Sequence, residues 1–131
     1  MAILGSILKR TFKLRESIPK IRKVNGYDQQ VKELKKLLMK AEFTAFGEHY
    51  GFSKLLNETN VVDAFQKTVH THDYNSMFKK WWYRALNGEA FVCWPKRIKY
   101  FALSSGTSES SSEYIPVTTD MLKAIKKSNI R

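Results

Sequence analysis

The sequence predicts an α+β domain in which the helices come first and short strands come late. Apolar residues recur at steps of three and four over residues 27–41 and again over residues 74–85, which is the spacing of one buried helix face. After these segments the pattern changes to short runs of aromatic and β-branched residues, which is typical of strands. We therefore expect residues 1–90 to be mainly helical, residues 91–118 to hold the strands, and residues 119–131 to begin a further helix.

The first predicted helix covers residues 2–15, and Pro19 ends its pattern. Four apolar residues share one side of it, with lysines and arginines following: Ile3, Leu4, Ile7 and Leu8. A helix of this kind either lies on an anionic membrane surface or docks on its own domain with the basic face in water. We favour the second interpretation.

The remaining helices are marked by spacing and by their ends. The segment 27–41 has the most regular apolar spacing, and its outward face carries four lysines: Lys32, Lys35, Lys36 and Lys40. A helical pattern resumes over residues 55–68 after a break at residues 47–51. Asp73 is a suitable N-cap for the helix over residues 74–85, and Asn87-Gly88 is a suitable stop.

The predicted strands are short. Residues 91–94 and 98–103 form two apolar runs separated by Pro95-Lys96-Arg97. Residues 114–117 form a third, in which a proline places the strand at an edge or a bend. Either Thr118 or Thr119 then caps the last helix.

Composition and charge exclude several classes of protein. The 131 residues make one domain, and 23 Lys and Arg against 12 Asp and Glu give a net charge of +11, with +8 of it in residues 1–40. The single Cys93 excludes a disulfide framework and a cysteine-rich zinc module, and its apolar neighbours indicate a buried thiol. No run of 18 uncharged apolar residues is present, and no basic region precedes the apolar start, so we expect no transmembrane segment and a cytoplasmic location.

The segment between the second and third predicted strands is rich in small hydroxyl residues. It begins with five residues that suit a phosphate-binding loop: Ser104, Ser105, Gly106, Thr107 and Ser108. Glycine lets backbone N–H groups approach an anion closely, and the hydroxyls add further donors. The Gly-Lys-Ser/Thr ending of a Walker loop is absent. By composition alone, a flexible linker is the competing interpretation.

Two other groups of residues suggest chemistry, and we assign function to neither. His70, His72 and Asp73 lie together, but no third clear metal ligand is near them in sequence, so a polar turn before a helix cap is favoured. Trp81, Trp82 and Tyr83 follow two lysines and would suit base stacking. Helical spacing instead places Trp81 in the core stripe and leaves Trp82 unexplained. No catalytic residue and no metal ligand is assigned.

The serine-rich segment and its flanks resemble a known family. The residues Phe101-Ala102-Leu103-Ser104-Ser105-Gly106-Thr107-Ser108, followed by Tyr114-Ile115-Pro116-Val117-Thr118, are similar to the nucleotide loop of the GH-three (auxin-responsive promoter) family of acyl-acid amido synthetases. These enzymes belong to the adenylate-forming superfamily. The resemblance extends upstream through Leu37-Leu38-Met39-Lys40-Ala41, Phe46-Gly47-Glu48-His49-Tyr50-Gly51-Phe52, Asp63-Ala64-Phe65 and Trp94-Pro95.

The resemblance implies an ATP-dependent reaction. The carboxylate of an acid substrate attacks the α-phosphate of ATP with the help of Mg²⁺ and releases pyrophosphate. An amine or, in relatives, a thiol then takes the acyl group from the acyl-adenylate. Ser104, Ser105, Gly106, Thr107 and Ser108 would hold the phosphates. The chain then corresponds to the first, helix-rich part of a large N-terminal domain (a fragment of residues 1–131), with the phosphate loop within residues 91–118, and we expect it to be inactive alone.

Two departures from the family pattern stand out. Glu113 occupies a position where the family often has lysine, and it either turns into solvent or weakens nucleotide binding. Val69-His70-Thr71 replaces a segment that commonly contains proline. In the family, later strands complete the sheet, so we expect the runs 91–94 and 98–103 to lack partners here. The fragment should then unfold with poor cooperativity or self-associate through exposed apolar edges.

The basic composition leaves two alternatives to an enzyme: a small nucleic-acid-binding domain and a membrane-surface domain. A steep salt dependence of nucleic-acid binding would favour the first. Sedimentation with anionic vesicles would favour the second.

Overall fold

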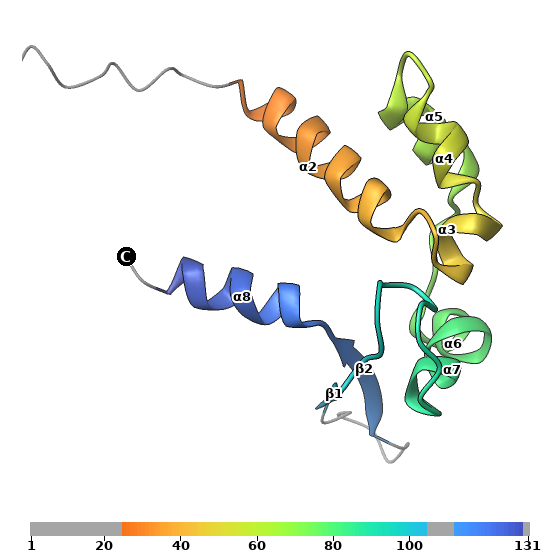
Figure 1. The fold of residues 1–131 in the computed structure, drawn as a ribbon, viewed down its shortest axis with the longest axis vertical. Coiled ribbons are helices and arrows are strands. Elements are labelled where there is room, and N and C mark those ends of the chain that lie inside the picture. Colours follow the sequence, from red (N-terminus) through yellow and green to blue (C-terminus); the bar gives the residue numbers. More distant parts are fainter. Residues whose placement is uncertain (1–24, 105–111, 130–131) are drawn as a thin grey trace, which may run out of the picture.

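The computed structural model describes residues 25–104 and 112–129 (Figure 1). These residues form helices and one two-stranded antiparallel sheet, so the α+β expectation is confirmed at that level. The predicted helix over residues 2–15 lies outside the described residues. The helices are α2 (Gly26–Ala41), α3 (Ala45–His49), α4 (Phe52–Leu56), α5 (Val61–Thr68), α6 (Tyr74–Met77), the π-helix η1 (Phe78–Trp82), α7 (Tyr83–Leu86) and α8 (Thr119–Ser128); the strands are β1 (Tyr100–Ser104) and β2 (Glu113–Val117).

Helix α2 confirms the helix predicted from the most regular apolar spacing in the sequence. Its N-cap is Asn25, whose side-chain oxygen accepts a hydrogen bond from the N–H of Tyr27 at 3.2 Å. Leu38 and Ala41 are buried on the side that packs against α4 and α5. None of the described helices is long and apolar enough to cross a membrane.

The first hydrophobic cluster joins α2, α4 and α5. Its buried members are Leu38, Ala41, Phe52, Leu55 and Val61. The prediction of one continuous helix over residues 55–68 is wrong, because the chain turns between α4 and α5. Asn60 accepts a hydrogen bond from the N–H of Asp63 at 3.1 Å and so begins α5 as a separate helix.

The second hydrophobic cluster is centred on Trp81, Ala85 and Val92. The π-helix η1 lies in the middle of the segment that the spacing predicts to be one regular helix. A π-turn adds a residue to the helical repeat and therefore shifts the side chains that follow it. As a result Trp82, which the helical stripe leaves out, packs against the same cluster as Trp81.

The predicted strand over residues 91–94 is wrong. The backbone of Phe91 has a φ of +58°, which a strand does not accommodate. The carbonyls of Phe91 and Val92 instead accept hydrogen bonds from the N–H groups of Ala45 and Phe46, both at 2.8 Å. The segment therefore satisfies the free donors at the start of α3 and forms no ladder with another strand.

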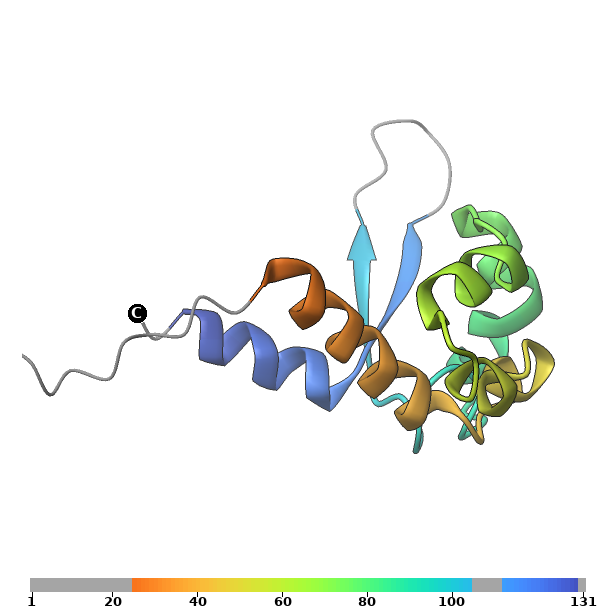
Figure 2. The ribbon, with the colours of Figure 1, turned by 90° about the horizontal axis from the view of Figure 1, so that it is seen from above.

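The hairpin of β1 and β2 carries the C-terminal part of the fold. The strands pair in a register that joins Tyr100 to Val117 and Ser104 to Glu113. The expectation that the run 98–103 lacks a partner is therefore wrong, and its strand begins two residues later than expected. Figure 2 shows β2 between β1 and the helices α6 and α7, with α8 and α2 on the other side of the hairpin.

Gly47 has no room for a side chain, because it lies where α3 meets the end of α2. Its N–H donates to the buried Thr44 hydroxyl at 3.0 Å, and a Cβ there would lie 1.9 Å from the carbonyl oxygen of Ala41. We expect Gly47→Ala to lower the free energy of unfolding by about 3 kcal/mol, because backbone must move to make room. Urea denaturation followed by tryptophan fluorescence measures this change.

The matched control is Gly26→Ala at the start of α2, where a Cβ would meet nothing within 4 Å. That variant should stay within about 1 kcal/mol of the wild type. Equal effects of the two substitutions would contradict the tight crossing at Gly47.

Candidate functional site

The candidate site is the connection between β1 and β2. Of the five residues predicted to bind phosphate, Ser104 is the last residue of β1 and is half-buried. Ser105, Gly106, Thr107 and Ser108 lie outside the described residues. The structure therefore places the base of the predicted loop between two paired strands, which is the strand–loop–strand setting that the sequence indicates.

Glu113 stands directly opposite Ser104 in the strand register. The hydroxyl of Ser104 donates a hydrogen bond to Oε2 of Glu113 at 3.2 Å. The carboxylate thus faces the first residue of the predicted loop and does not turn away into solvent. Any anion that the loop binds close to Ser104 also meets this negative charge.

Tyr74 ties the hairpin to the helices. Its hydroxyl accepts a hydrogen bond from the N–H of Tyr114 at 2.8 Å and donates a longer one to the Tyr114 carbonyl at 3.5 Å. The Tyr74 ring is stacked against Phe78 in η1, with ring centroids 5.6 Å apart. In the sequence, Tyr74 belongs to the apolar spacing of residues 74–85, and no pattern links it to Tyr114, 40 positions later.

Helix α8 leaves the hairpin directly after β2. Thr118 is its N-cap, since the Thr118 hydroxyl accepts a hydrogen bond from the N–H of Met121 at 3.0 Å. Asp120 accepts hydrogen bonds from Lys40 Nζ at 2.8 Å and from Trp94 Nε1 at 3.2 Å. These bonds, that of Lys40 above all, lower the pKa of the Asp120 carboxyl and attach the first turn of α8 to α2.

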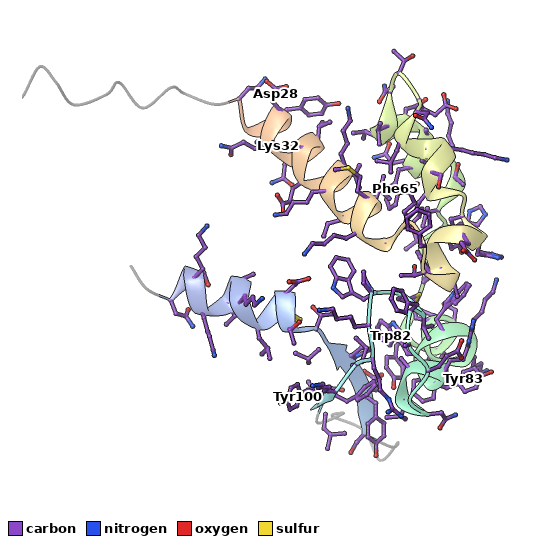
Figure 3. The ribbon with its side chains drawn as sticks, viewed as in Figure 1. Asp28, Lys32, Phe65, Trp82, Tyr83 and Tyr100 are labelled. Carbon is purple, nitrogen blue, oxygen red and sulfur yellow. The ribbon has the colours of Figure 1, made fainter. Side chains whose placement is uncertain are left out.

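A cavity of about 170 Å³ lies beside the hairpin, between the helices and β2. Its lining includes Trp82, Cys93, Lys96, Pro116 and Thr118. Trp82 points from the helices toward this side, whereas Tyr83 lies on the outer side of the helices (Figure 3). Burial raises the pKa of the Cys93 thiol to about 12, so the thiol stays protonated and unreactive at neutral pH.

The histidine group is structural in the described fold. His72 Nε2 lies 2.9 Å from the Tyr50 hydroxyl, and Asp73 caps α6 by accepting a hydrogen bond from the N–H of Ser76 at 2.7 Å. His70 is exposed. Within residues 25–104 and 112–129, no group of three or more histidine, cysteine, aspartate or glutamate side chains could hold a metal ion.

Trp81, the first of the aromatic residues after Lys79 and Lys80, is not available to stack on a base. Trp81 is only 3% exposed and belongs to the second hydrophobic cluster. Lys80 Nζ lies 5.1 Å from the centroid of the Trp81 ring and donates to His49 Nε2 at 3.0 Å. These contacts cover the ring and leave no face of it for a nucleobase.

The tie between Tyr74 and the hairpin can be measured. Tyr74→Phe should lower the free energy of unfolding by about 1 kcal/mol, because the N–H of Tyr114 loses its partner while the ring is kept. Chemical denaturation is the measurement. Tyr27→Phe is the matched control, since the Tyr27 hydroxyl is exposed and makes no hydrogen bond with the described residues; a loss as large in that variant would show that the effect is unspecific.

The raised pKa of Cys93 predicts slow alkylation of the folded protein. At pH 8 the thiolate fraction should be about 10³-fold below that of the unfolded chain, whose thiol has an ordinary pKa of 9.0. Iodoacetamide labelling followed by mass spectrometry, with and without urea, measures the ratio of rates. Similar rates in the two states would contradict the burial of this thiol.

Comparison with known proteins identifies the family. Residues 20–130 match the family model described as the GH3 family N-terminal domain, which is well over half of the chain. Searches of curated proteins and of solved structures gave no significant match. The matched region contains both hydrophobic clusters, the hairpin and all of α8. The chain therefore belongs to the GH3 family, through that family's N-terminal domain.

Proposed function

We propose that this chain is the N-terminal segment of an ATP-dependent acyl-adenylating ligase of the acyl-acid amido synthetase type, which acts in the cytoplasm. The observation that carries the proposal is the serine-rich connection between paired strands β1 and β2 within a GH3 family N-terminal domain. In this proposal the chain is part of an N-terminal domain that is mainly helical up to residue 90. Residues 91–118 contain the phosphate loop, and residues 119–131 continue into a helix.

The proposed role of the loop is to bind and orient the phosphates of ATP. The segment from Ser104 to Ser108 offers hydroxyl and backbone N–H donors, and the paired strands fix Ser104 opposite Glu113, where the connection that contains this segment begins and ends. Fixed donors stabilise the charge that develops on the phosphate oxygens while the carboxylate of the acid substrate attacks the α-phosphate. Pyrophosphate leaves as the acyl-adenylate forms, and an amine, or a thiol in relatives, then accepts the acyl group while AMP leaves.

The residues at the base of the loop fit a bound Mg²⁺–nucleotide better than a free nucleotide. Glu113 places one negative charge beside Ser104, where it repels phosphate. Mg²⁺, when bound, supplies positive charge that offsets this repulsion and neutralises the phosphates. Within the chain, the Ser104 hydroxyl would exchange its bond to Glu113 for one to a phosphate oxygen.

The alternative of a small nucleic-acid-binding or membrane-surface domain is not favoured. Family membership points to an enzyme, and Trp81 is buried where base stacking would need it exposed. The basic segment 1–40 that motivated this alternative includes residues 26–40 of α2. The apolar side of α2 packs in the first hydrophobic cluster.

Titration calorimetry with ATP and Mg²⁺ tests the proposal. Glu113→Lys should tighten binding by about three- to tenfold, because a repulsive charge beside the phosphates becomes an attractive one and salt screens part of the gain. Glu58→Lys is the matched control, because it makes the same charge change in the turn between α4 and α5. Equal effects of the two variants on ATP affinity would show that only the net charge of the chain matters, and would contradict a position of Glu113 beside the phosphates.

Gly106→Val tests the loop itself. A β-branched side chain at this position should abolish ATP binding, since it blocks the approach of the backbone to the phosphates. Circular dichroism checks that the variant keeps the wild-type fold. Unchanged affinity in a folded variant would remove the phosphate-loop assignment.

A further inference from the structure

The Tyr74 hydroxyl contacts both backbone polar groups of Tyr114. It accepts a hydrogen bond from the N–H at 2.8 Å and donates a longer one to the carbonyl at 3.5 Å. Inside a sheet, outward groups of this kind bond to a neighbouring strand. On β2 the side chain of a helical residue takes that place, and Figure 2 shows β2 on the side of the hairpin that faces α6 and α7.

The alternation of a β-strand connects this contact to the base of the proposed loop. In an antiparallel pair, residues that turn their N–H and C=O groups toward the partner strand alternate with residues that turn them away. Tyr114 faces away from β1, so its neighbour Glu113 faces β1, where the register pairs it with Ser104. The Ser104 hydroxyl also donates to the Glu113 carboxylate at 3.2 Å. Tyr74 therefore holds the residue next to the pair that bounds the loop.

Tyr74 is itself held in place by the helices. It is the first residue of α6 and directly follows the N-cap Asp73. Its ring is stacked against that of Phe78, with centroids 5.6 Å apart, and meets the ring of Trp82 at an interplanar angle of 64° and a distance of 5.8 Å. Packing against two rings of η1 restricts the side-chain torsions of Tyr74. The hydroxyl therefore has a defined place, which it passes on to β2.

We propose that Tyr74 is a positioning residue for the phosphate loop, because through Tyr114 it fixes Glu113 and Ser104 at the base of that loop. This inference rests on the proposed function, since it concerns the same ATP phosphates. Tyr74 needs no contact with the nucleotide in this role. It fixes β2 before ATP binds, so that the fold sets the distance between the side chain at position 113 and the phosphates.

Amide hydrogen exchange measured by NMR tests whether Tyr74 fixes the base of the loop. In Tyr74→Phe, which keeps the ring and removes the hydroxyl, the amides of Glu113 and Ser104 should exchange about two- to fivefold faster. The matched control is Asn60→Ala, which removes the cap of α5 and costs a similar amount of stability away from the hairpin. There the two amides should exchange as in the wild type. Equal exchange of these amides in the two variants would overturn the proposal.

A double-mutant cycle tests the connection to ATP. Glu113→Lys is expected to tighten the binding of ATP with Mg²⁺, and this gain requires position 113 to be held beside the phosphates. When combined with Tyr74→Phe, the gain should fall to about twofold or less, because the lysine is no longer held there. When combined with Asn60→Ala, it should keep its full size of about three- to tenfold, since a loss of stability alone does not couple to position 113. Titration calorimetry measures the affinities.

The two measurements separate this proposal from the proposed function. If the wild-type chain binds no ATP, the proposed function fails, and the exchange of the two amides alone decides whether Tyr74 fixes the base of the loop. If the wild type binds ATP and Glu113→Lys gives the same gain with Tyr74→Phe as with Asn60→Ala, the proposed function stands and the positioning role of Tyr74 is contradicted. Circular dichroism checks that each variant keeps the wild-type fold.

Discussion

Two backbone hydrogen bonds join α3 to the segment that follows α7, at the place where the two hydrophobic clusters meet. The N–H groups of Ala45 and Phe46 donate to the carbonyls of Phe91 and Val92, both at 2.8 Å. Phe46 packs against both hydrophobic clusters, and its ring lies 5.9 Å from that of Phe52 and 5.3 Å from that of Trp81. The junction thus holds the two clusters against each other and fixes the start of the segment that leads to the hairpin.

The parts of the fold that follow local rules could be predicted from the sequence. Helix α2 has regular apolar spacing, and Asp73 and Thr118 cap helices because their side chains reach the N–H three residues later. The segment 91–94 could not be predicted, since its aromatic and β-branched residues favour a strand until α3 offers them free donors. The π-turn at η1 likewise depends on how both Trp81 and Trp82 meet the second cluster.

The candidate site divides in the same way. Small hydroxyl residues and a glycine between two apolar runs were enough to predict a loop between strands, and the resemblance to the GH3 family is confirmed by the family match over residues 20–130. The contacts at the base of the loop were beyond sequence reasoning. The bond from Ser104 to Glu113 depends on strand register, and the bond from Tyr74 to Tyr114 joins residues that only the packing of η1 brings together.

The two strands of the hairpin are held by different contacts. β2 is fixed by Tyr74 at Tyr114 and by the first turn of α8, where Asp120 meets Lys40 and Trp94. β1 is held through its pairing with β2 and through Phe101, which packs against the second cluster. Glu113 therefore belongs to the strand that contacts Tyr74 and α8, and Ser104 to the strand that is paired with it. The hydrogen bond between Ser104 and Glu113 joins the two strands at the base of the proposed phosphate loop, so the position of Ser104 depends on the contacts that hold β2.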